Sequence, residues 1–425
     1  MLAAHALFLG AGLSSAAAQT VQCGQVLASS IVLASDLTNC TGDGLVIGVN
    51  GITVDLNGKT VDGVGLGVGI RNDGFDEVTI RNGTVQEFDY GVVLNAETRR
   101  NVVEYLTLTQ NEFAGVWLSD SDENLVRENV VERQANEGIV LVASSEGNTV
   151  VGNRVEFNGG EALLLERSVH NRVESNLFTN NGDRGVQLIA SPANTLVANV
   201  VSENSDGGLE LVEGSADNRL ELNTIASNGD GGLIISDSDR NHLGRNTIHD
   251  HSDAGVSVKA SNGTILLGNT IRDSNDSGIV LDDSNDGMVG GNDVRHNVGG
   301  IELSSSSGNW LVANDASDTT GNGIELEESY VLVLNTVNRN NAGGVYIDGG
   351  GPNGEGNILD RNSTDDNLGD GIVLKKEGHT IVGNTANRNE GWGIYADVGT
   401  IDGGGNSASG NAEGAQYFGP VVCSP

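Results

Sequence analysis

A segment of about 23 residues recurs along most of the chain, and this repeat limits the possible folds more than any other feature of the sequence. The phrase Gly-Val-Gln-Leu, which begins at Gly185, returns as Gly-Leu-Glu-Leu at Gly208. Ala162 takes the glycine position once. Clear or fainter copies begin at Gly44, Gly69, Gly91, Gly115, Gly138, Gly232, Gly255, Gly278, Gly300, Gly323, Gly344, Gly371 and Gly393. Self-similarity at this period is typical of stacked repeats, and the copies add up to about sixteen coils.

Each repeat contains short segments in which apolar residues alternate with polar ones. Val186 and Leu188 flank Gln187, and this period of two is typical of a strand with one buried face. Two further short strands are expected around Leu196 and Val201. Such short strands form a sheet only by pairing with the same strand of the coils above and below, at about 4.8 Å. The sequence therefore predicts an all-β fold, a single-stranded right-handed parallel β-helix with three sides.

One asparagine occupies an equivalent position in most repeats. Asparagine tolerates left-handed backbone conformations and bonds its own turn, and stacked asparagine side chains can also bond one another. We interpret these residues as structural corners, and the repeated glycine as a tight turn before the strand. The asparagines are Asn153, Asn176, Asn199, Asn223, Asn246, Asn269, Asn292, Asn314, Asn335, Asn362 and Asn384.

The composition agrees with a thin solenoid rather than a large globular core. The 425 residues include 62 glycines and only four prolines, and 4% of the chain is aromatic. No segment has a sustained period of 3.6 residues, so we expect almost no helix. We predict one elongated β-helix domain at 44–410, between an N-terminal cap at 19–43 and a tail or cap at 411–425.

The N-terminal segment predicts export. Residues 1–18 contain a short apolar run followed by small residues that end at Ala18, which is typical of a secretory signal peptide. We therefore expect a secreted, periplasmic or cell-surface protein. Cys23 and Cys40 bracket the first coil, and in an exported chain a disulfide between them is expected. Cys423 is then left over.

The charge of the chain excludes two classes of partner. The formal net charge is −36, from 58 acidic and 22 basic residues. Nucleic acid and anionic membrane surfaces would be repelled by it. No stretch after the leader is long and apolar enough to span a bilayer, so we expect no membrane insertion. We expect a monomer.

The segment 23–63, which contains Gly-Ile-Thr-Val-Asp-Leu-Asn-Gly from Gly51, resembles the start of many secreted bacterial right-handed parallel β-helix repeat proteins. This group includes periplasmic nitrous-oxide-reductase accessory proteins of the NosD type and many carbohydrate-active enzymes. The resemblance covers about 23–410. It implies the fold and leaves the activity open, because stacked repeats host unrelated functions. The Asp-Pro-His motif of alginate C5-epimerases is not present, and two methionines with seven scattered histidines do not favour copper handling.

Acidic residues gather on one face of the later coils. In each Gly-Ile-x-Leu-x unit both x residues point outward, and neighbouring coils bring their side chains to about 5 Å along the axis. Carboxylates at that spacing suit a general acid and base, or oxygen ligands for Ca²⁺. The catalytic candidates are Glu302, Glu325, Glu327, Asp348 and Lys375; the substrate-binding candidates are Asp282, Tyr346, Tyr395 and Asp397.

These residues favour a secreted protein that binds an extracellular polysaccharide and, if it is an enzyme, cleaves or modifies it as a glycoside hydrolase or lyase with paired carboxylates. Tyrosines beside acids suit the grip of a sugar, and Ca²⁺ is the one cofactor left open. The alternative is that the acids form a solvated face, as expected of a chain that is acidic throughout. The protein would then be a non-catalytic structural or adhesive rod. A metal-handling accessory role comes third.

Overall fold

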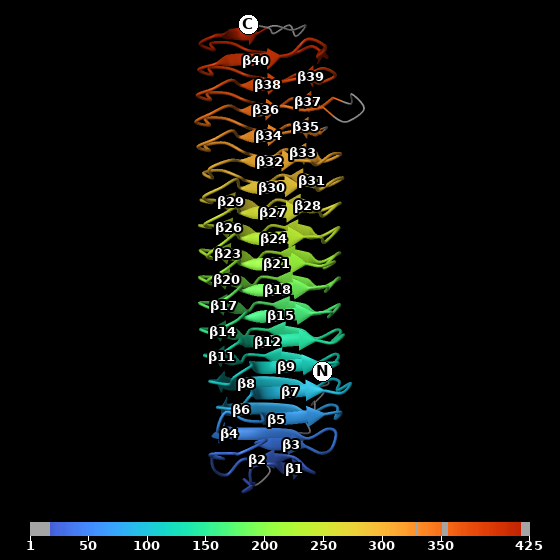
Figure 1. The fold of residues 1–425 in the computed structure, drawn as a ribbon, viewed down its shortest axis with the longest axis vertical. Coiled ribbons are helices and arrows are strands. Elements are labelled where there is room, and N and C mark those ends of the chain that lie inside the picture. The colour runs from blue at the N-terminus through green and yellow to red at the C-terminus, as the bar shows by residue number, and fades with distance from the viewer. Residues whose placement is uncertain (1–17, 329, 351–355, 418–425) are drawn as a thin grey trace, which may run out of the picture.

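The computed structural model describes residues 18–328, 330–350 and 356–417. Within these ranges there is no helix, and the chain winds into a right-handed parallel β-helix of about 17 turns (Figure 1). The predicted fold class is confirmed. Nearly all of the expected leader, and Cys423, lie outside the described residues.

One side of the rod is an 18-stranded parallel sheet, called here the main sheet, in which each strand pairs with the equivalent strand of the next turn. Its strands are β1 (Gln25–Leu27), β3 (Leu45–Ile47), β5 (Val68–Asp73), β7 (Tyr90–Asn95), β9 (Ala114–Ser119), β12 (Glu137–Val142), β15 (Leu163–Glu166), β18 (Val186–Ile189), β21 (Leu209–Val212), β24 (Leu233–Ser236), β27 (Val256–Lys259), β30 (Ile279–Asp282), β32 (Ile301–Ser304), β34 (Ile324–Leu326), β36 (Val345–Ile347), β38 (Ile372–Leu374), β40 (Trp392–Ala396) and β42 (Gly414–Tyr417).

The other strands form two further stacks. The second stack consists of β2 (Ile31–Val32), β4 (Thr53–Asp62), β6 (Thr79–Gln86), β8 (Val102–Thr109), β10 (Leu125–Arg127), β13 (Thr149–Val151), β16 (Arg172–Glu174), β19 (Thr195–Val197), β22 (Arg219–Glu221), β25 (His242–Gly244), β28 (Ile265–Leu267), β31 (Met288–Gly290), β33 (Trp310–Val312), β35 (Val331–Val333), β37 (Ile358–Asp360), β39 (Thr380–Val382) and β41 (Ile401–Asp402). The third consists of β11 (Val130–Glu132), β14 (Arg154–Glu156), β17 (Leu177–Thr179), β20 (Val200–Ser202), β23 (Thr224–Ala226), β26 (Thr247–His249) and β29 (Thr270–Arg272), and the long strands β4, β6 and β8 extend into it.

The predicted alternation within a coil is confirmed. Val186 and Leu188 are fully buried, whereas Gln187 between them is half-buried on the outer surface. Gln187 lies in register with Glu210 of the next turn. The same register along the rod stacks the inward side chains into one continuous core of valine, isoleucine and leucine. Outward side chains therefore form columns parallel to the rod axis.

The asparagines form a buried ladder, as expected, but the left-handed residue is not the asparagine. The Asn199 Oδ1 accepts hydrogen bonds from the backbone N–H and the Nδ2 of Asn176, both at 3.0 Å. The residue with positive φ is the preceding one, Ala198, at 55°. Because Ala198 makes the corner, Asn199 keeps an ordinary backbone conformation and its side chain points into the ladder.

The repeated glycine lies at the predicted bend before the strand, and its lack of a side chain has a further role. Gly208 does not have a left-handed backbone conformation. A Cβ at this position would lie 2.6 Å from the carbonyl oxygen of Gly232 and 2.5 Å from a methyl group of Ile225. The chain bends at Gly208 as predicted, but glycine is needed there because two turns of backbone and a core side chain approach closely.

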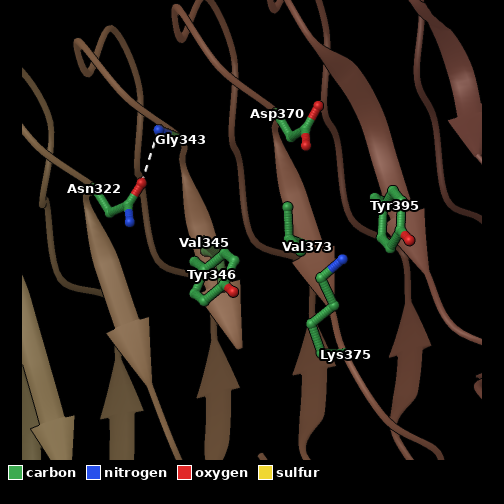
Figure 2. A pocket seen from close by; sticks show the side chains of 8 residues that line it. All are labelled: Asn322, Gly343, Val345, Tyr346, Asp370, Val373, Lys375 and Tyr395. Carbon is green, nitrogen blue, oxygen red and sulfur yellow. Dashed lines mark hydrogen bonds between the residues drawn. The ribbon is translucent and has the colours of Figure 1, made fainter. Parts of the chain in front are cut away.

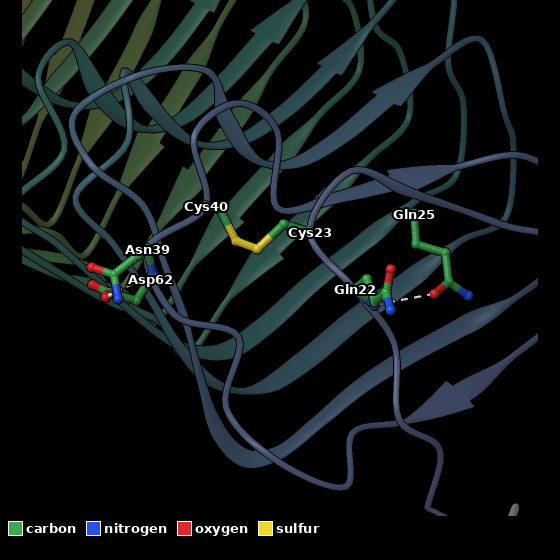
Figure 3. The surroundings of a disulfide bond; sticks show 6 residues. All are labelled: Gln22, Cys23, Gln25, Asn39, Cys40 and Asp62. Atoms are coloured by element: carbon green, nitrogen blue, oxygen red, sulfur yellow. Dashed lines mark hydrogen bonds between the residues drawn. A yellow bond between two sulfur atoms is a disulfide. The ribbon is translucent and has the colours of Figure 1, made fainter.

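The predicted disulfide is present at the N-terminal end of the rod (Figure 3). Cys23 is bonded to Cys40 across 17 residues, with 5.4 Å between their Cα atoms. A disulfide is compatible with an extracellular or periplasmic location. The described part of the chain contains no helix that is long and apolar enough to cross a membrane.

Strands extend into both expected caps. β1 lies within 19–43 and pairs with β3, and β42 lies within 411–425 and pairs with β40.

Candidate functional site

The outer face of the main sheet places the sequence-derived candidates in two columns. In the first column each residue is the register partner of the next, in the order Glu302, Glu325, Tyr346, Val373 and Tyr395. The second column follows the strand ends, where each backbone N–H donates to a carbonyl of the preceding turn, in the order Glu327, Asp348, Lys375 and Asp397. Asp282 is the last residue of β30 and lies in register with Ser304, the last residue of β32, so it belongs to the second column two turns before Glu327. Each column therefore brings two acidic residues together on neighbouring turns: Glu302 with Glu325 in the first, and Glu327 with Asp348 in the second.

A pocket of about 320 Å³ opens on this face between β34 and β40 (Figure 2). Three of the sequence-derived candidates contribute to it: Tyr346, Lys375 and Tyr395. Its other lining residues are Asn322, Gly343, Val345, Asp370 and Val373. The tyrosines stand on strands two turns apart, with the small Val373 between them, and this gap makes the hollow (Figure 2).

Polar groups at the rim are held in place by neighbouring turns. The Lys375 ammonium lies 3.7 Å from the centre of the Tyr395 ring, a cation–π contact. The Asn322 Oδ1 accepts a hydrogen bond from the Gly343 N–H at 2.8 Å, and its Nδ2 donates to Glu325 at 3.0 Å. The pocket thus combines two aromatic faces, an ammonium, a carboxylate and an amide.

The remaining acidic candidates lie outside the pocket lining, and several are already hydrogen-bonded. Glu302 accepts a hydrogen bond from the Ser277 hydroxyl at 3.0 Å, and Asp282 accepts one from the Ser304 hydroxyl at 3.0 Å. Asp397 accepts one from a backbone N–H at 2.9 Å. Glu327 and Asp348 are exposed beside the pocket, on neighbouring turns.

Sequence reasoning missed three pocket residues that share one position in the repeat. Asn322, Gly343 and Asp370 each stand immediately before the repeated glycine. The alternation of apolar and polar residues begins only after that glycine, so it does not show which way these side chains face. A sequence signal was present nonetheless. The residue directly before the repeated glycine stacks on the equivalent residue of the next turn, so these residues form a further column on the same face.

A second group of side chains on the main sheet lies in the N-terminal half. The Tyr90 ring lies 5.3 Å from the rings of both Phe113 and Trp117, centre to centre. Two to three turns further along, burial raises the pKa of the Glu161 carboxyl above its ordinary value, and the carboxylate of Glu137 acts in the same direction. The alternation after Gly115 placed Trp117 on this outward face. Tyr90, Phe113 and Glu161 were not predicted, because they precede the repeated glycine position.

The second stack carries an exposed apolar column. Met288, Trp310, Val331 and Ile358 are register partners on successive turns, and 54% of Trp310 is exposed. A smaller hollow of about 180 Å³ adjoins Trp310 and Tyr330. On earlier turns the same column carries charged residues such as Arg172. The described residues contain no group of three or more histidine, cysteine or acidic side chains placed to hold a metal ion.

The family described as "Right handed beta helix region" matches residues 28–160, 66–225 and 216–353, which together span most of the chain. The chain belongs to the right-handed β-helix family. A comparison with curated proteins finds no match.

Solved structures of other right-handed β-helices resemble the fold at low identity. The Azotobacter vinelandii mannuronan C-5 epimerase AlgE6 A-module is 15% identical over 67% of this chain and 82% of its own, with a TM-score of 0.42. The DFA-IIIase of Arthrobacter chlorophenolicus A6, in complex with GF2, is 11% identical over 61% of this chain and 81% of its own, with a TM-score of 0.47.

Proposed function

We propose that this β-helix protein binds an extracellular polysaccharide along the outer face of its main sheet. The pocket between Tyr346 and Tyr395 is the observation that supports this function. Two aromatic faces about 10 Å apart along the axis suit the apolar faces of a sugar chain. The Lys375 ammonium, the Asp370 carboxylate and the Asn322 amide supply donors and acceptors for hydroxyl groups.

The charge of the face restricts the polysaccharide. Lys375 is the one cationic group that lines the described pocket, and the columns beside it carry Glu325, Glu327 and Asp348. In a chain of net charge −36, a strongly anionic glycan would be repelled unless Ca²⁺ bridged it to the protein. We therefore propose a neutral glycan, or an acidic one that is bound with Ca²⁺.

The acids beside the pocket would supply a reaction. Glu302 and Glu325 are register partners, and Glu327 and Asp348 occupy equivalent positions on neighbouring turns, at about 4.8 Å along the axis. Retaining glycosidases separate their two carboxyl groups by about 5–5.5 Å. We propose hydrolysis or β-elimination by one of these pairs, with Lys375 or a tyrosine as a further proton carrier.

Binding to a panel of neutral and acidic polysaccharides, by affinity electrophoresis with Ca²⁺ and with EDTA, tests this function. The Y346A/Y395A double variant is expected to bind at least about tenfold more weakly, because each sugar–aromatic contact contributes on the order of 1 kcal/mol. The matched control is Tyr105→Ala, since Tyr105 is an exposed tyrosine of β8, away from the pocket. Equal affinity for the wild-type protein and the double variant contradicts the proposed pocket.

Reducing-end release from the same panel tests the reaction separately. If the protein is an enzyme, the E325Q/D348N variant should lose turnover while it keeps binding. Release that survives in this variant and in E302Q contradicts the proposed catalytic acids. Binding without release by the wild-type protein leaves the polysaccharide-binding function and removes hydrolysis and β-elimination.

A second candidate function, an adhesive rod, is favoured by the apolar column on the second stack. Met288, Trp310 and Ile358 are 38%, 54% and 45% exposed on a protein that is otherwise strongly acidic. Exposed apolar patches of this kind mark contact surfaces. Retention of the full chain on octyl-agarose at low salt tests it: the W310A/I358A variant should elute earlier, and Tyr105→Ala should not. Elution of the wild-type protein in the void volume contradicts an adhesive role.

A further inference from the structure

His379 occupies a position that asparagines hold in most other turns. In the preceding turns of this ladder, the Oδ1 of Asn171 accepts hydrogen bonds from the backbone N–H and the Nδ2 of Asn148, at 2.8 and 3.1 Å. The same two groups of Asn357 contact the Nδ1 of His379, at 3.1 and 3.2 Å. An imidazole nitrogen thus replaces an amide oxygen as the acceptor.

These contacts define the protonation state of the ring. A backbone N–H only donates, so the Nδ1 of His379 must carry a lone pair. The Nε2 then carries the proton and donates it to the Lys375 carbonyl oxygen, at 2.7 Å. The side chain is fully buried, and this burial lowers the pKa of the imidazole below its ordinary value. The nearby charged groups are Asp397, which opposes this effect, and Lys376, which adds to it.

The ring also closes the turn that carries a pocket residue. Lys375 follows β38, and its ammonium lies over the Tyr395 ring at the pocket. The His379 ring bonds the Lys375 carbonyl, and the next N–H, of Lys376, donates to the Asp397 carboxylate at 2.9 Å. The imidazole therefore ties the base of the Lys375 side chain to the ladder in the core.

We propose that His379 is a positioning residue whose protonation releases Lys375 from the pocket, so that glycan binding weakens in acid. Protonation would place an N–H on Nδ1 against two N–H groups of Asn357, and the ring would have to leave the ladder. Its bond to the Lys375 carbonyl would be lost with it. The expected loss of glycan binding in acid rests on the proposed function, whereas the release of Lys375 does not.

The variant His379→Asn is the matched control, because asparagine is the ladder's own residue and supplies a neutral acceptor that does not titrate. The chain contains four lysines, so each can be followed by mass spectrometry. The full-length protein is treated with an N-hydroxysuccinimide acetate ester between pH 5 and 8 without a glycan. The acetylation of Lys375 is divided by that of Lys259, which cancels the common effect of pH on amines.

In the wild-type protein this ratio should rise severalfold as the pH falls through the pKa of His379, and in His379→Asn it should not change with pH. Binding of a polysaccharide found at pH 7.5 should weaken severalfold as the pH falls through that pKa, in the wild-type protein alone, and then level off because the tyrosines still contact the glycan. A ratio that is constant in the wild-type protein overturns the inference, whatever the variant does. Equal pH dependence in both proteins also overturns it. A changing ratio without any glycan binding supports the role of His379 and contradicts the proposed function.

Discussion

A single ladder asparagine connects three turns of the rod. The Asn199 Oδ1 accepts two hydrogen bonds from Asn176, and its Nδ2 donates to Asn223 and to the carbonyl of Val173. All of these groups are buried, so each depends on the protein for its hydrogen bonds. The recurrence of asparagine was enough to predict the ladder. The corner at Ala198 was not predictable, because the sequence does not show which of two neighbouring residues points inward.

Replacement of Asn199 by alanine should therefore destabilise the protein. The buried N–H groups of Asn176 would lose their acceptor, and we expect the free energy of unfolding to fall by about 1–3 kcal/mol. Urea denaturation followed by circular dichroism measures the change. The control is Asn136→Ala, an exposed asparagine, for which about 0.5 kcal/mol or less is expected. A loss in Asn199→Ala no greater than in the control would show that the ladder does not carry stability.

At the scale of the strands, the sequence was informative wherever a residue follows the repeated glycine. The alternation of inward and outward residues after the glycine correctly placed Glu325, Tyr346 and Tyr395 in one outward column. It could not place Asn322 or Asp370, because the backbone direction before the glycine depends on how closely two turns approach. The pocket was therefore only partly predictable from its own residues.

Two breaks in the asparagine ladder lie beside hollows of the surface or beside pocket residues. Tyr330 and His379 both stand where most turns have asparagine, and each adjoins a hollow or a pocket residue. Thr264 and Gly287 also replace the asparagine but line neither hollow, so a break in the ladder does not locate a site without the structure.

At the scale of the whole molecule, charge opposes the stacking of turns. The 58 acidic and 22 basic residues leave a net charge of −36 on a narrow rod. Surface pairs such as Arg388 with Asp366 relieve only part of this repulsion. The stability of the rod should therefore depend on ionic strength more than that of a neutral protein of the same length.

Raising NaCl from 0.05 to 1 M should raise the Tm by several degrees, because the screening length falls to about 3 Å and repulsion among acids is reduced. Differential scanning calorimetry measures the shift, and KCl should give the same result. Sucrose, which does not screen charge, serves as the control for general stabilisation. A Tm that falls with salt would mean that the surface ion pairs outweigh the repulsion.

The register of the turns also has a consequence for how such a protein evolves. Because each turn contacts only its neighbours, one repeat can be duplicated or deleted without a change in how the rest of the core packs. Each such event between Trp117 and the Tyr395 pocket moves the two sites apart or together by about 4.8 Å on the same face. The gene can thus lengthen or shorten the reach between two surface sites in whole-number steps while their local chemistry is inherited intact.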